Sequence, residues 1–178
     1  MSNDCTGVLR VVSKNKETIE RIIKILNYED SEYALYRCKY AQKLGVMEED
    51  GDFFVQDIEI SGAWTCDQFF FHGDNPNDKV LEDVVDGKKV YGTAHFTDLC
   101  HLATVLDFGC ELFSEEWGCG FCDHFEVNHN GEIQHENGDF EANYPEDENG
   151  EPDYDAEPDL CYGIDGYGEY CDNDCIYG

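Results

Sequence analysis

Four cysteines of this chain have the pairwise spacing of metal ligands: Cys119, Cys122, Cys171 and Cys175. The first pair has Cys-x-x-Cys spacing beside glycines that permit a tight knuckle, and three residues separate the second pair. We expect these thiolates to bind one structural, tetrahedral zinc ion, in which two other residues can replace a cysteine: His124 and Cys161. Buried free thiols are the main alternative. A redox Cys-x-x-Cys motif should open a helix, whereas strand-like segments flank this pair.

Further polar residues follow this motif on a predicted strand. Cys122, His124 and Glu126 should share one face, because side chains alternate along a strand. His135 should lie opposite Glu126, across the Asn130-Gly131 turn. A metal-dependent enzyme could use such a face. The sequence has no nucleotide-binding loop, dinucleotide-binding glycine motif, nucleophile elbow or zinc-protease motif, so we do not expect an enzyme.

The sequence EPDYDAEPDL, at residues 151–160, has an acidic side chain at every second position: Glu151, Asp153, Asp155, Glu157 and Asp159. In an extended chain, alternate residues are about 6.6 Å apart, close to the roughly 6–7 Å between phosphates along one nucleic-acid strand. We expect this segment to bind a partner protein by resembling a phosphate backbone. The alternative is a solvated acidic linker.

Negative charge is concentrated in the second half of the chain. The formal net charge of the 178 residues is −30, and all 11 Lys and Arg residues precede residue 90. Residues 90–178 contain 23 Asp and Glu residues, against 18 in residues 1–89. This composition excludes nucleic acid and anionic membranes as simple partners, because phosphate binding requires Lys and Arg. The expected partners are metal ions, or a protein with a basic, nucleic-acid-binding surface.

The N-terminal sequence and the apolar segments indicate a cytoplasmic protein. MSNDCTGVLR lacks the basic and apolar regions of a signal peptide, and no apolar stretch is long enough to span a bilayer. In a reducing compartment, most of the ten cysteines should be thiols or metal ligands. The alternative is a secreted scaffold held by disulfides, which the missing signal and the chain length disfavour.

Hydrophobic periodicity predicts an α+β fold. Strands are expected at residues 6–13, 33–47, within 50–74, and in an antiparallel meander over 110–143. Helices are expected at residues 14–30, within 74–88, and at 93–109. Ile58, Ile60 and Trp64 should point into the core, and Gly109 should end the last helix as its C-cap.

These elements suggest a domain over residues 1–143 with a ferredoxin-like antiparallel sheet and two main helices. Asn130-Gly131 and Asn137-Gly138 are typical of tight hairpin turns within it. Residues 144–178 form an acidic arm that contains tyrosines and cysteines. We expect this arm to pack on the domain and to be fastened there by the zinc ion.

Part of the chain, over about residues 90–133, has a family resemblance. The segment HFTDLCHLATVLDFGCELFSEEWGCGFCDHFEVNHNGEI resembles the helix, strand, glycine-rich turn and strand of the YubB/Api92-like ferredoxin-like proteins of phages and plasmids. The resemblance implies the ferredoxin-like sheet and brings no catalytic residues.

In character, the chain resembles the phage-encoded anti-CRISPR proteins that inhibit type II Cas9. The resemblance rests on EPDYDAEPD, on the half of the chain without Lys or Arg, and on CGFC. It implies that an acidic surface docks on the positively charged channel of Cas9 in the cytosol of a host cell and prevents target DNA from loading. The alternative is a structural zinc-binding interaction module of a phage or plasmid, without an inhibitory role.

Overall fold

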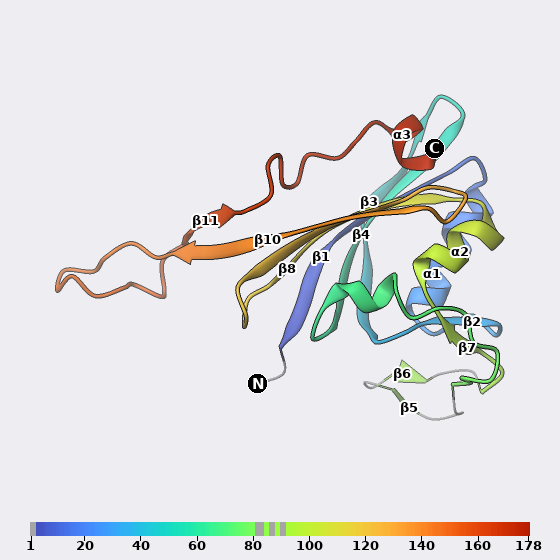
Figure 1. Cartoon of the computed structure of the whole chain (residues 1–178), viewed down its shortest axis with the longest axis horizontal. Helices are drawn as coiled ribbons and strands as arrows, with labels where there is room; N and C mark the ends of the chain where they lie inside the picture. The colour runs from blue at the N-terminus through green and yellow to red at the C-terminus, as the bar shows by residue number, and fades with distance from the viewer. Residues whose placement is uncertain (1–2, 81–83, 86–87, 90–91) are drawn as a thin grey trace.

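The computed structural model describes residues 3–80, 84–85, 88–89 and 92–178. Its centre is a curled seven-stranded sheet in which all neighbouring strands are antiparallel (Figure 1). From one edge to the other, the strands are β11 (Asp159–Tyr162), β10 (Ile133–Asn143), β9 (Phe121–Val127), β8 (Gly109–Glu116), β1 (Asp4–Ser13), β4 (Phe53–Ala63) and β3 (Cys38–Asp50). The predicted antiparallel meander is therefore confirmed in β8, β9 and β10.

Two helices pack on one face of this sheet: α1 (Lys16–Leu26) and α2 (Leu99–Leu106). The first helix was predicted, and it begins where the Asn15 side chain accepts a hydrogen bond from the backbone N–H of Glu17. Buried side chains of both helices form one core with Leu9, Ile58 and Phe125 of the sheet. No helix in the described part of the chain is long and apolar enough to cross a membrane.

The second helix starts later and ends earlier than predicted. Asp98 caps it by accepting a hydrogen bond from the backbone N–H of His101, so the residues before Asp98 stay extended. The prediction of Gly109 as C-cap is wrong. Asp107 takes the left-handed conformation after α2, with φ of 59°, and Gly109 is the first residue of β8.

Smaller elements complete the fold: β2 (Tyr33–Leu35), η1 (Cys66–Phe69), β5 (Val84–Val85), β6 (Lys88–Lys89) and β7 (His95–Thr97). β2 pairs in parallel with β7, and β5 pairs antiparallel with β6. The helix predicted within residues 74–88 lies partly outside the described residues, and two of the described positions there belong to β5. A disulfide joins Cys5 of β1 to Cys66 of η1, while the other eight cysteines form no disulfide.

Two further predictions fail for local reasons. Ile58 and Ile60 are fully buried as expected, but the side chain of Trp64 is 57% exposed. Trp64 has a φ of 71°, so the alternation of β4 does not continue through it. Asn137-Gly138 is not a turn, because both residues lie inside β10 and pair with β9.

The other face of the sheet is crossed by residues 163–178, which we call the C-terminal strap (Figure 1). The strap ends in the short helix α3 (Asn173–Tyr177). Ile176 of this helix is fully buried against Val12 and Val55. The sheet is therefore covered by α1 and α2 on one face and by the strap on the other.

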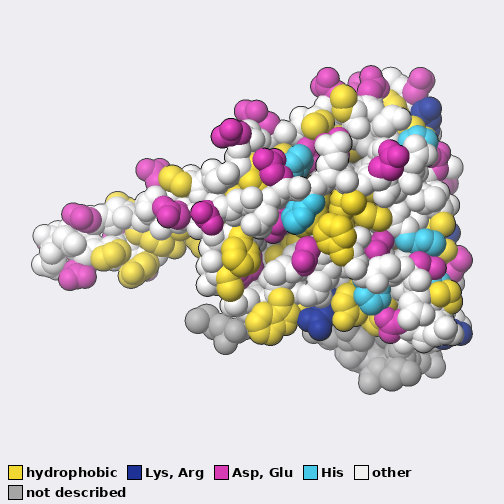
Figure 2. Space-filling model, viewed as in Figure 1, with side chains coloured by type: hydrophobic (Ala, Val, Ile, Leu, Met, Phe, Trp, Pro, Cys, Tyr) yellow, Lys and Arg dark blue, Asp and Glu magenta, His cyan; other side chains and the backbone are white. Residues whose placement is uncertain are grey.

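Residues 144–158 connect β10 to β11, and we call them the acidic loop. The loop projects from the edge of the sheet, away from the helices (Figure 1). Figure 2 shows carboxylates along this projection, which contains no Lys or Arg.

Candidate functional site

The Cys-x-x-Cys motif lies at the turn between β8 and β9. The Glu116 carboxylate organises this turn by accepting hydrogen bonds from the backbone N–H groups of Gly118, at 3.0 Å, and Cys119, at 2.8 Å. The Cys119 side chain is exposed, whereas Cys122 is buried and its thiol donates to the carbonyl oxygen of Asp139 at 3.5 Å. Desolvation raises the pKa of the Cys122 thiol.

The other predicted zinc ligands lie elsewhere. Two of them, on β11 and α3, are exposed to solvent: Cys161 and Cys175. Cys171 lies in the strap beside Glu111. Cys122 pairs with Glu115, four residues from Glu111 on β8, a separation of roughly 13 Å along the strand. Ligands of one zinc ion lie about 2.3 Å from it, so the arrangement of these cysteines does not support the four-cysteine site.

The predicted face of β9 is confirmed in part. Cys122, His124 and Glu126 alternate with buried Phe125 and Val127, which belong to the core beneath the helices. The first three residues therefore face the strap. Cys122 contacts the apolar cluster around Ile164, while His124 and Glu126 lie further along β9.

The predicted position of His135 is wrong by one residue. His135 pairs with Phe125, not Glu126, because a five-residue loop connects β9 to β10 in place of a two-residue turn. A shift of one residue moves a side chain to the opposite face of a sheet. His135 stacks on Phe125, with ring centroids 4.3 Å apart, and its Nε2 lies 2.8 Å from Asp123 Oδ1.

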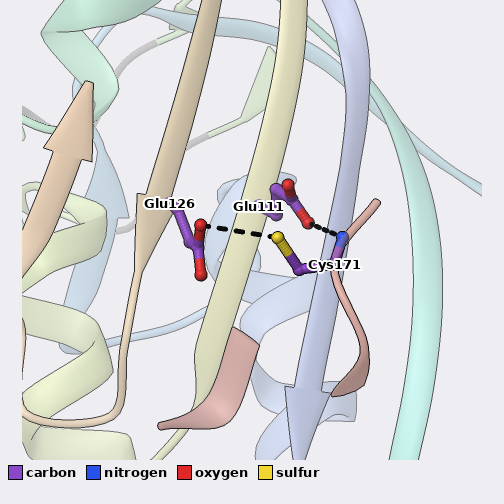
Figure 3. Close-up of side chains that lie close together, drawn as sticks. All are labelled: Glu111, Glu126 and Cys171. Carbon is purple, nitrogen blue, oxygen red and sulfur yellow. Dashed lines mark hydrogen bonds between the residues drawn. The ribbon is translucent and has the colours of Figure 1, made fainter. Parts of the chain in front are cut away.

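A cluster of ligand-type side chains lies beneath the strap, and its centre is Glu111. Oε1 of Glu111 lies 2.7 Å from Nε2 of His124, and Oε2 accepts a hydrogen bond from the backbone N–H of Cys171 at 2.9 Å. The Cys171 thiol donates to Oε2 of Glu126 at 3.7 Å (Figure 3). The side chain of Glu111 has no exposed surface. Three separate segments, β8, β9 and the strap, thus supply this cluster.

The surroundings of the cluster disfavour a negative charge on the thiol. Burial raises the pKa of Cys171 to about 12, and the carboxylates of Glu111 and Glu126 add to this effect. In the part of the chain that the structure describes, neither carboxylate forms an ion pair with Lys or Arg. Without a bound metal ion Cys171 is therefore a thiol at neutral pH, and a metal ion that binds its sulfur would displace the proton.

Tyr170 holds the strap next to this cluster. Its hydroxyl donates to the carbonyl oxygen of Val8 at 2.5 Å, and the Arg10 guanidinium lies 4.2 Å from the centre of its ring. Arg10 also forms two hydrogen bonds with the Asp57 carboxylate, at 2.8 and 3.0 Å. Tyr170 is thus anchored to β1, and it holds the adjacent Cys171 against the sheet.

An acidic cleft of about 570 Å³ opens beside Cys171. Four aspartates line it, from the β3–β4 turn and from the start of α3: Asp50, Asp52, Asp172 and Asp174. The amide of Asn173 donates to Asp50 at 2.7 Å and joins the two walls. Arg10 also lines the cleft but is paired with Asp57, so the four aspartates leave the cleft with a net negative charge that favours cations.

The acidic loop is a folded-back segment and not a straight strand. Asp153 N–H donates to the carbonyl oxygen of Pro145 at 2.8 Å, and Asp147 N–H donates to that of Glu151 at 2.7 Å. The Asp153 side chain then accepts from Asp155 N–H at 3.1 Å, which makes a turn. The expected straight register is therefore interrupted within residues 153–156, although four of the five carboxylates are exposed: Glu151, Asp155, Glu157 and Asp159.

Sequence reasoning missed Glu111 as a site residue. The available signal was an acidic residue between Cys110 and Leu112, within the run Phe108–Phe113 that is otherwise apolar. A carboxylate in such a strand must find hydrogen-bond donors where it is buried.

Comparisons with known proteins give no relative from which a function can be taken. No protein-family model matches the chain, and neither the curated proteins nor the solved structures include a significant match.

Proposed function

We propose that this chain is an inhibitor that binds the basic, nucleic-acid-binding surface of another protein, with a Cas9-type effector as the partner. The observation that carries the proposal is the acidic loop, which projects from the sheet and contains acidic but no basic residues. Binding would prevent target DNA from loading. The inhibitor would act in the host cytoplasm, and it would itself be no enzyme.

Electrostatics supports this choice of partner. A Cas9-type effector holds its guide–target duplex in a positively charged channel and contacts its backbone. Complementary charge accelerates association and orients the two proteins. Residues 90–178 have no Lys or Arg to oppose that attraction.

For the fold, the proposal includes a ferredoxin-like core that presents the loop. The strand order β8-β1-β4-β3, with α1 after β1 and α2 before β8, supports a split β-α-β arrangement. β9, β10 and β11 then extend the sheet on the β8 side. The acidic loop leaves this extension at its outer edge, where α1 and α2 would not obstruct a large partner (Figure 1).

The test measures target-DNA binding by a Cas9–guide complex, with and without excess protein, at low and high salt. We expect DNA loading to fall at low salt and to recover as salt screens the charges. Unchanged DNA loading at low salt would exclude a Cas9-type partner.

A matched pair of variants tests the surface. In the first, four carboxylates of the acidic loop and the adjacent one on β11 become amides: Glu151, Asp153, Asp155, Glu157 and Asp159. In the control, the same change is made at five exposed positions elsewhere: Glu17, Glu20, Glu29, Glu48 and Glu49. Both variants lose five negative charges, and only the first should lose inhibition. Equal loss in both would mean that net charge, and not the loop, determines binding.

A further inference from the structure

Two carboxylates and one thiol converge beneath the strap. Ligand atoms of Glu111, Glu126 and Cys171 all lie within 4.8 Å of one another (Figure 3). Among the residues that the structure describes, they are the only three or more His, Cys, Asp or Glu residues that meet this condition. Arg10 interacts electrostatically with Glu111 but is paired with Asp57, and in the described part of the chain neither Glu111 nor Glu126 forms an ion pair with Lys or Arg.

We propose that Glu111, Glu126 and Cys171 form a binding site for a divalent transition-metal ion, best suited to zinc. Zinc accepts carboxylate oxygen and cysteine sulfur at about 2.0–2.3 Å, and three protein ligands leave one tetrahedral position for water. Calcium and magnesium prefer oxygen ligands alone, so the sulfur selects against them. The site differs from the four-cysteine site and shares only Cys171 with it.

His124 is a positioning residue for this site. Its Nε2 lies 2.7 Å from Glu111 Oε1, and its ring stacks on Phe113 with centroids 4.3 Å apart. Such outer contacts fix the orientation of ligating carboxylates in metal sites. The backbone N–H of Cys171 holds the other oxygen of Glu111, which keeps a second lone pair for a metal ion.

The ion has a route to the site. Glu126 and Cys171 are each half-buried, and Cys171 also lines the acidic cleft. The four aspartates of that cleft raise the local concentration of cations at its mouth. Binding would connect β8, β9 and the strap through a single ion.

The experiment titrates cobalt(II), as a spectroscopic substitute for zinc, into the full chain under a non-thiol reductant after treatment with a chelator. We expect one cobalt ion per chain, with a sulfur-to-cobalt charge-transfer band that zinc abolishes by displacement. Cys171→Ser should remove the band. Glu126→Gln, at a half-exposed position, should weaken cobalt affinity at least about tenfold, and His124→Gln should weaken it while retaining the band.

Three cysteine variants are the matched controls: Cys119→Ser, Cys122→Ser and Cys175→Ser. All three should retain the cobalt band and the affinity of the parent chain. Loss of the band in Cys119→Ser would overturn the proposal in favour of the four-cysteine site. A band that persists in Cys171→Ser, or no cobalt binding by the parent chain, would also overturn it. Because metal binding is measured on the isolated chain, its failure is distinguishable from failure of the proposed inhibition.

Discussion

Nε2 of His124 lies 2.7 Å from Oε1 of Glu111 and joins β9 to β8 on the sheet face that the strap covers. The other oxygen of Glu111 receives the backbone N–H of Cys171. One fully buried carboxylate thus connects two strands to the end of the chain.

Glu111→Ala should lower the free energy of unfolding by about 1.5–3 kcal/mol, because both donors lose a charged acceptor. Urea denaturation followed by circular dichroism measures this change. Glu136→Ala is the control on the neighbouring β10, since its side chain is exposed and its loss should cost less than about 0.5 kcal/mol. Similar values for the two variants would contradict a central role for Glu111.

Ile176→Ala should loosen the strap. The side chain is fully buried against Val12 and Val55, so its truncation should destabilise the protein by about 2–5 kcal/mol. Hydrogen exchange should accelerate most in residues 170–178, while the amides of α1 stay protected. Leu160→Ala, at a position 40% exposed on β11, is the comparison and should leave strap exchange unchanged.

The protein should lose stability between about pH 10 and pH 12 through Tyr162. Burial raises the pKa of Tyr162 to about 12, and the Glu115 carboxylate, which accepts its hydroxyl hydrogen bond at 3.0 Å, adds to the shift. The folded state therefore holds this proton more tightly than the unfolded state, whose tyrosines ionise near pH 10. The stabilisation is complete below about pH 10 and disappears as pH rises through the folded pKa.

Denaturation midpoints across this alkaline range test the Tyr162 prediction. Tyr162→Phe should flatten the dependence, because phenylalanine has no ionisable group. Tyr144→Phe serves as the control, since Tyr144 lies in the acidic loop and contacts Tyr154 alone among the aromatic rings described. An unchanged slope in Tyr162→Phe would argue against the assignment.

Replacing the disulfide between Cys5 and Cys66 should destabilise the protein. The two residues are 61 apart in sequence, and a loop of that length corresponds to about 4 kcal/mol of unfolded-state entropy. The double variant Cys5→Ser, Cys66→Ser should therefore unfold at lower denaturant concentration. Its midpoint should match that of the parent chain under reductant, and any large further effect of reductant on the variant would point to another disulfide.

Local signals in the sequence were sufficient for several elements. The periodic isoleucines after Asn15 predicted α1, and the alternation through Ile58 and Ile60 predicted β4. Both patterns involve only residues that are close to one another in the sequence. The prediction failed where a single capping side chain decides a boundary, as Asp98 does at α2.

The candidate site depends on long-range contacts that the spacing of residues in the sequence does not predict. Cys171 meets Glu111 although 60 residues separate them, and the cysteine pairs gave no indication of this contact. The face on which His135 lies depended on the length of one loop, because a register shift of one residue moves the side chains of a strand to the opposite face. The sequence predicted His124 and Cys171 as candidate ligands but missed Glu111, the residue that contacts both.

The interior position of β1, between β8 and β4, has a consequence for how the chain folds. Cys5 pairs with Gly62 on one side and with Glu116 on the other, so the strand needs a partner more than 100 residues further along. Such distant pairing must overcome a large loop-closure entropy before it becomes favourable, which slows folding to roughly milliseconds to seconds. During that interval β1 has an unpaired edge, and refolding at high protein concentration should compete with aggregation through this edge.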